Sequence, residues 1–116
     1  MKLDYSHDLI VTIIRKGCCE RVVKASKKAG AEGGTVIYGR GTGIHEQKTL
    51  LGIPIEPEKE IILTLIPKDK TDEVHEAIVA AGNLNKPGTG VSFVLEVKQV
   101  AGIVHLLEQM EGNEKK

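Results

Sequence analysis

Aromatic residues are almost absent from this chain of 116 residues, which contains no tryptophan, one phenylalanine and two tyrosines. Single-stranded nucleic acid is usually bound on several aromatic side chains that share one sheet face. Tyr5, Tyr38 and Phe93 are too few to build such a surface. An RNA-binding module is therefore disfavoured.

An excess of charge is also missing, since sixteen lysines and arginines balance sixteen aspartates and glutamates. This balance argues against broad attraction to nucleic acid or to an anionic membrane, while local charged patches remain compatible with it. The apolar run near the N-terminus, residues 9–14, is far shorter than a signal-peptide core or a membrane span. We therefore expect one cytoplasmic domain over residues 1–116, with no membrane insertion.

Groups typical of catalysis or metal binding are sparse. Cys18 and Cys19 are adjacent, which allows neither a long disulfide nor a CxxC metal pair, and we expect small helix residues with one of them facing inward. The four histidines lack HxH or HxxxH spacing, and the Ser-His-Asp run at 6–8 is contiguous, whereas a triad converges in space. The glutamates within 56–60 are interpreted as solvated, with a paired-carboxylate site as the alternative. We predict no catalytic site and no metal site.

What the chain does contain is an internal repeat. A shift of 52 residues places LIVTII at 9–14 over IILTLI at 61–66, and both segments are typical of buried strands. The same shift superimposes small and apolar residues of the segments that follow: Val22 on Val74, Ala25 on Ala77, Ala29 on Ala81 and Gly30 on Gly82. A strand, a helix and a glycine stop thus occur twice.

The ends of the two repeated helices can be predicted from local residues. The segment at 19–29 has apolar or small residues at helical spacing, and Gly30 supplies a left-handed stop. In the second helix, Asp69 is the expected N-cap, and a buried stripe begins at Val74.

A further strand is expected after each helix, at 35–39 and at 91–97. The order βαββαβ predicts an α+β fold of the ferredoxin-like type, with an antiparallel four-stranded sheet and both helices on one face. Because the strands show little polar alternation, we expect another subunit to cover the open face. The segment 100–107 predicts a short closing helix, followed by a flexible tail at 108–116.

The first unusual connection runs over residues 39–58, about twenty residues between two core strands. Most hairpin connections have about two to five residues, and long ones are usually functional or disordered. Gly39, Gly41 and Gly43 allow successive backbone N–H groups to point at one anion, with a flexible hinge as the alternative.

The second unusual connection is NLNKPGTG at residues 83–90. Lys86 offers a point charge, Gly88 and Gly90 allow close backbone approach, and Thr89 has a hydroxyl for a phosphate oxygen. The full GxxxxGK[ST] pattern is missing, so no Walker-type loop is predicted, and a plain turn is the alternative.

Together these features resemble the PII nitrogen regulatory proteins over roughly residues 8–103. The resemblance is carried by the order of elements, by GRGTG at the start of the long loop, by Lys59 ahead of the strand that ends in Ile66-Pro67, and by NKPGTGVSFVLEV. It implies a homotrimer in which the sheets face inward and nucleotide binds in clefts between neighbouring subunits.

The resemblance also implies roles for the two connections. Residues 43–58 correspond to the T-loop, which changes shape with ligand and docks onto a target enzyme, transporter or transcription factor. Residues 84–90 correspond to the phosphate-facing B-loop, and residues 1–7 are left as an N-terminal arm. The implied ligand-binding residues are Gly41, Gly43, His45, Lys59, Lys86, Gly88, Thr89 and Gly90. The resemblance also implies that Lys59 reaches the co-ligand 2-oxoglutarate. The alternative is a solvated lysine at the start of a strand.

The chain departs from the family pattern at several charged positions. Val91, Gly102 and Val104 stand where the family has a lysine and two arginines, and His45 stands where it has a glutamine. Each lost charge-assisted bond costs about 1.5–3 kcal/mol. We therefore expect ADP or AMP in preference to ATP as the effector, or a small anion such as bicarbonate. The loop is shorter than usual and has no tyrosine for uridylylation.

The expected function is that of a divergent PII-like regulator that is not an enzyme. Its effector would bind in the clefts, and its long loop would control a target protein, with a membrane transporter and nitrogen regulation as candidates. The alternative is a small trimeric ferredoxin-like enzyme or a metal-binding protein of the copper-tolerance type. That alternative requires His, Cys or carboxylate side chains that converge at a cleft.

Overall fold

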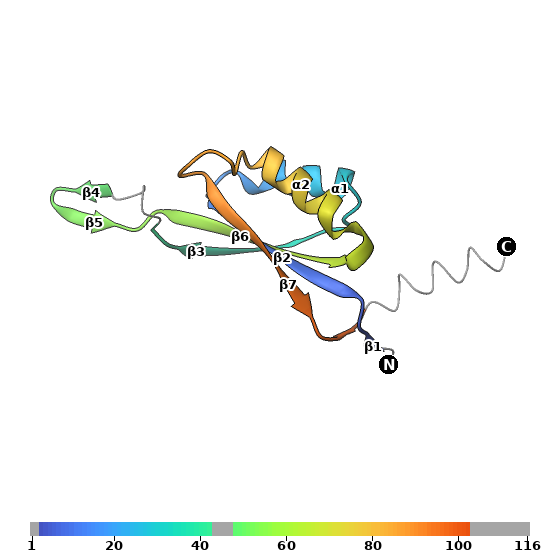
Figure 1. Ribbon diagram of the computed structural model, residues 1–116. Helices are drawn as coiled ribbons and strands as arrows, with labels where there is room; N and C mark the ends of the chain where they lie inside the picture. Colours follow the sequence, from blue (N-terminus) through green and yellow to red (C-terminus); the bar gives the residue numbers. More distant parts are fainter. Residues whose placement is uncertain (1–2, 43–47, 103–116) are drawn as a thin grey trace, which may run out of the picture.

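The fold is given by a computed structural model that describes residues 3–42 and 48–102. Its centre is an antiparallel sheet with the strand order β3-β6-β2-β7, and both helices pack on one face of it (Figure 1). The elements are β2 (His7–Arg15), α1 (Cys19–Lys28), β3 (Thr35–Arg40), β6 (Glu58–Pro67), α2 (Thr71–Ala81) and β7 (Gly90–Val97). The predicted ferredoxin-like fold is confirmed. No helix in the described part of the chain is long and apolar enough to cross a membrane.

The repeat places equivalent residues at equivalent depth in the core. Strand residues alternate between faces, and Ile10 of β2 lies opposite Thr64 of β6, so both strands direct every second side chain toward the helices. The resulting buried pairs, each member at most 1% exposed, are Ile10 and Ile62, Thr12 and Thr64, Ile14 and Ile66, and Val22 and Val74. The core therefore lies between the sheet and the two helices.

The predicted stop at Gly30 agrees with the structure, whereas the predicted stop at Gly82 and the predicted N-cap do not. Gly30, just after α1, has a φ of 127°, as its predicted role requires. Gly82 has a φ of -82°, and the left-handed residue after α2 is Asn83 with a φ of 54°.

Asp69 is not an N-cap, because it lies in the short 3-10 helix Lys68–Lys70 and α2 begins at Thr71. The Thr71 hydroxyl donates a hydrogen bond of 2.8 Å to Asp8 of β2. The start of α2 is thus stabilised by a contact distant in sequence.

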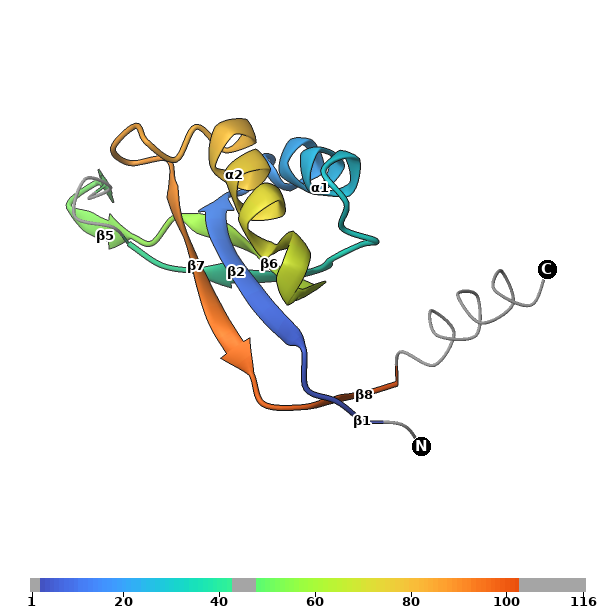
Figure 2. The same cartoon turned by 45° about the vertical axis from the view of Figure 1, so that its right-hand side comes forward.

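A short two-stranded sheet extends one end of the structure (Figure 2). It consists of β1 (Leu3–Asp4) paired with β8 (Val100–Ala101). The predicted closing helix is therefore wrong at its start, because the pairing with β1 makes these two residues a strand. Residues 103–107 of that prediction and the tail at 108–116 lie outside the described residues.

A hairpin projects from the opposite end of the main sheet (Figure 1). It consists of β4 (Lys48–Leu50) and β5 (Ile53–Ile55), which the sequence did not predict. Leu51 at its turn has a φ of 54°, a conformation that a leucine rarely adopts. The side chains of Leu51 and Ile53 are 94% and 66% exposed.

The sheet face that carries no helix is almost entirely apolar. Its half-buried centre consists of Leu9, Val11, Ile13, Ile61 and Leu63, and its more exposed members are Ile37, Leu65, Val91, Phe93 and Leu95. Cross-strand neighbours such as Val11 and Phe93 make this surface continuous. An apolar surface of this kind marks an interaction site.

Candidate functional site

The long connection after β3 is closed at its base by backbone pairing. β3 and β6 remain paired as far as Arg40 opposite Glu58. One step further, the Gly41 N–H donates to the Pro57 carbonyl over 3.2 Å. The projecting hairpin therefore starts from a base that is part of the main sheet. Gly41, one of the predicted site residues, therefore lies at the base of the loop.

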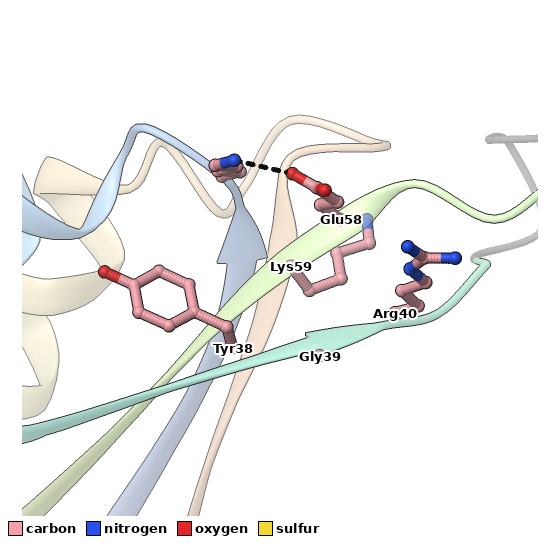
Figure 3. Close-up of a pocket in the computed structure, with 6 residues that line it drawn as sticks. Tyr38, Gly39, Arg40, Glu58 and Lys59 are labelled. Atoms are coloured by element: carbon pink, nitrogen blue, oxygen red, sulfur yellow. Dashed lines mark ion pairs between the residues drawn. The ribbon is translucent and has the colours of Figure 1, made fainter.

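A pocket of about 400 Å³ lies at this base. Its lining consists of Lys16, Tyr38, Gly39, Arg40, Glu58 and Lys59. Figure 3 shows the side chains of Arg40, Glu58 and Lys59 gathered where β3 ends and β6 begins, with Tyr38 further along β3. Three cationic side chains against one acidic side chain favour an anionic ligand.

An exposed ion pair bridges one side of the pocket. Lys16 Nζ lies 2.8 Å from Glu58 Oε2. This hydrogen bond raises the pKa of Lys16 and lowers the pKa of Glu58, and the attraction between the two charges acts in the same direction. Because both side chains are exposed to solvent, the pair contributes little to stability. Lys16 can therefore leave Glu58 and pair with a bound anion.

Among the described residues, Lys59 is the predicted site residue that lines this pocket. It is only 7% exposed, so the alternative of a solvated lysine at a strand start is not what the structure shows. A lysine is rarely buried to this extent unless its charge is paired. Lys59 and Arg40 come from the paired ends of β6 and β3, and both line the pocket (Figure 3).

Glu60 is not a solvated carboxylate, contrary to the sequence interpretation, since it is 4% exposed. Its Oε1 accepts hydrogen bonds from the backbone N–H groups of Gly17, Cys18 and Cys19 over 2.6, 2.9 and 3.0 Å. Burial raises the pKa of Glu60, but the hydrogen bonds from Cys19 and from the backbone outweigh burial and hold this pKa below its usual value. The carboxylate thus satisfies the free N–H groups at the start of α1.

The two cysteines are free and both pack against the core. The hydrogen bond with Glu60 is the main reason that the pKa of Cys19 is raised, and burial adds to it. A raised pKa reduces the thiolate fraction that redox chemistry needs. Among the described residues, no three His, Cys, Asp or Glu side chains are grouped closely enough to hold a metal ion.

The connection between α2 and β7 is held together by Thr89. Its hydroxyl lies 2.9 Å from the Asn83 carbonyl and 2.8 Å from the Lys86 carbonyl, and it donates to them. A phosphate oxygen accepts hydrogen bonds and would compete for the same proton. The geometry therefore gives Thr89 a structural role in this turn.

Gly90 has a structural role as well. Its φ is 151°, and a Cβ at this position would lie 2.5 Å from the carbonyl oxygen of Ile13. Gly88, with a φ of 81°, also adopts a conformation that favours glycine. Both glycines are thus required by the path of the chain into β7.

The two predicted ligand segments reach the same end of the sheet without sharing a pocket. Gly90 pairs with Ile14 on one side of β2, and Lys59 pairs with Arg15 on the other side. Strand β2 lies between them, and residues 86–90 do not line the pocket at the loop base. The remaining predicted site residues, Gly43 and His45, lie outside the described residues.

Four residues of the pocket were missed by the sequence analysis: Lys16, Tyr38, Arg40 and Glu58. Each lies at or near a predicted strand end, but only the registers of β3 with β6 and of β2 with β6 bring them together. Glu60 could have been found, because it alternates in phase with Ile62 and Thr64 on the buried face of its strand.

Comparison with known proteins agrees with this fold. A family model described as nitrogen regulatory protein P-II matches residues 7–105. A search of curated protein sequences finds no significant match. Among solved structures, the PII protein of Arabidopsis thaliana bound to citrate is similar with a TM-score of 0.64 and 25% sequence identity, over 82% of this chain and 80% of that chain. Since the family model spans most of its length, this chain belongs to the nitrogen regulatory protein P-II family.

Proposed function

We propose that this chain is a cytoplasmic regulator without catalytic activity, which binds a small anionic effector and controls a target protein through residues 43–58. The observation that carries this proposal is the cationic pocket at the base of the projecting hairpin. A ligand at this position touches both strands from which the hairpin starts. Its binding can therefore favour one arrangement of the loop over another.

The proposed effector is an adenine nucleotide or another small anion. Lys16, Arg40 and Lys59 provide positive charge, and the ring of Tyr38 is exposed beside them. The Arabidopsis relative is bound to citrate, a small anion with several charges. Because Val91 and Gly102 offer no charge, the effector should be ADP or AMP in preference to ATP.

The proposed target surface is the hairpin of β4 and β5. Leu51 and Ile53 expose apolar side chains there, with nothing in the described structure covering them. Apolar side chains at an exposed tip are suited to insertion into a partner surface. A membrane transporter is the candidate target, and nitrogen supply is the candidate signal.

The proposed assembly is a homotrimer whose open sheet faces meet in the centre. The continuous apolar face supports this arrangement, because burying it gains hydrophobic free energy. In this assembly the ligand-binding residues carried over from the family would complete clefts between subunits. They are Gly41, Gly43, His45, Lys59, Lys86, Gly88, Thr89 and Gly90.

Isothermal titration calorimetry tests the effector. The purified protein is titrated with AMP, ADP, ATP and citrate, each with and without 2-oxoglutarate. We expect saturable binding of at least one adenine nucleotide, with ADP or AMP bound more tightly than ATP. No measurable binding of any of these compounds would overturn the proposal.

Matched variants test the position of the site. Lys59→Gln and Arg40→Gln should each weaken nucleotide binding about tenfold or more, since each removes a charge-assisted contact. Lys24→Gln removes one exposed charge from α1 that does not line the pocket, and it should leave the affinity unchanged. An equal loss in all three variants would show a nonspecific effect of charge and would contradict the assignment.

A further inference from the structure

A second and smaller pocket lies at the end of the sheet opposite to the loop base. Its volume is about 80 Å³. One wall is apolar and consists of Leu65, Ile66 and Pro67 at the end of β6. This part of β6 is not covered by β3, because the pairing of the two strands stops at Leu63 opposite Thr35.

His7 lines this pocket, and one nitrogen of its ring is engaged in a hydrogen bond. The residue is 6% exposed, and its Nδ1 lies 3.1 Å from Asp4 Oδ1. Asp4 also accepts hydrogen bonds from the Ser6 N–H and hydroxyl, over 2.7 and 2.6 Å, which are the main causes of its lowered pKa. An ionised carboxylate can only accept, so Nδ1 carries a proton and donates the hydrogen bond to Asp4.

Two side chains of opposite charge complete the polar part of the pocket. They are Glu32, after α1, and Lys70, before α2, and both are exposed. The Cδ of Lys70 lies 3.5 Å from the place that a Cβ on Gly30 would occupy, so its stem crosses the turn after α1. The pocket is therefore lined by an imidazole ring and by two side chains of opposite charge.

The size of the pocket limits its ligand to a few atoms. A cavity needs about 10–15 Å³ by this measure to hold one water molecule. A volume of about 80 Å³ therefore suits a molecule of about five to eight non-hydrogen atoms. Nucleotides and citrate are too large for it.

We propose that this pocket binds a small α-amino acid, such as glycine or alanine. Its ammonium group would pair with Glu32 and its carboxylate with Lys70, beside the ring of His7. A simple carboxylate would face Glu32 without compensation, and a simple amine would leave Lys70 without a ligand partner. The apolar wall from β6 accommodates a methyl group. The site is separate from the effector pocket and goes beyond the proposed function.

Nuclear magnetic resonance tests this proposal on the full-length protein. Amide spectra are recorded during titration with glycine and with L-alanine, and acetate, methylamine and L-leucine serve as ligand controls. We expect saturable shifts of the amides of Gly30 and Leu65 with the two small amino acids. The three controls should give no saturable shift at these residues.

The exposed charged residues provide the variants, because buried His7 cannot be replaced without risk to the fold. Glu32→Gln and Lys70→Gln should each weaken glycine binding about tenfold, and Lys24→Gln should leave it unchanged. Absence of a glycine or alanine shift in the wild-type protein would overturn the proposal. So would unchanged binding in both variants, or acetate binding as well as glycine does. Nucleotide binding by calorimetry should be normal in both variants, so that failure here is distinguishable from failure of the effector pocket.

Discussion

At the scale of single residues, the close approach of β7 to the Ile13 carbonyl of β2 depends on Gly90. Gly90→Ala should lower the free energy of unfolding by about 2 kcal/mol or more, because its Cβ would meet the Ile13 carbonyl oxygen at 2.5 Å and its φ is positive. Urea unfolding followed by circular dichroism measures the change. Gly33→Ala is the matched control, since no atom lies within 4 Å of its added Cβ, and it should change stability by less than about 0.5 kcal/mol. Equal effects would refute the steric explanation.

Glu60 makes stability depend on pH. Its folded pKa lies below the usual 4.5, so its stabilising effect is fully present above about pH 4.5 and is lost as the pH falls through the folded pKa. Glu60→Gln should destabilise the protein by about 1–3 kcal/mol near neutral pH, and this difference should shrink near pH 3. Urea midpoints at both pH values provide the measurement. Glu58→Gln, which removes an exposed carboxylate, should show a much smaller effect, and a constant difference for Glu60→Gln would contradict the role of its charge.

The residue scale also shows where sequence reasoning succeeds and fails. The core was predictable because Ile10 and Ile62 recur at the same place in a repeat and lie in apolar runs. The burial of Lys59 was not predictable, because charged residues are usually exposed, whereas strand alternation already places Glu60 in phase with buried Ile62 and Thr64. The burial of both charged residues depends on the loop base and on the turn before α1, which come together only in the folded sheet.

At the scale of elements, the hairpin of β4 and β5 is separable from the sheet. Replacing residues 43–55 by Asn-Gly joins residues 42 and 56 through a two-residue turn and preserves the pairing of Gly41 with Pro57. The free energy of unfolding should stay the same or rise by about 1–2 kcal/mol, because a shorter loop costs less entropy to close. Urea unfolding of the shortened and full-length proteins tests this. A loss of more than about 1 kcal/mol would mean that the loop stabilises the sheet.

The elements that the sequence did not predict are the short ones. The four long strands and both helices have enough residues to show a hydrophobic period. Strands β1 and β8 have two residues each, and β4 and β5 have three, too few for any period to appear. The prediction of a helix at Val100 was wrong for a further reason. The strand at Val100 forms by pairing with Asp4, which is distant in sequence.

At the scale of the whole molecule, the apolar sheet face determines the predicted assembly. Light scattering with size-exclusion chromatography should give three times the 12.6 kDa mass of the chain. Phe93→Glu places a charge on this face and should convert the trimer to smaller species, because an unpaired charge is costly to bury. Lys24→Glu on the exposed side of α1 should leave the mass unchanged. A wild-type protein of 12.6 kDa would contradict the trimer.

The strand order has a consequence for the origin of the fold. The strands of the first repeat, β2 and β3, are not neighbours in the sheet, and neither are those of the second, β6 and β7. Each repeat therefore receives all of its strand partners in the main sheet from the other repeat. An ancestor that carried a single copy could have formed this sheet only as two interlocked chains, and the present protein is in effect such a dimer fused into one polypeptide.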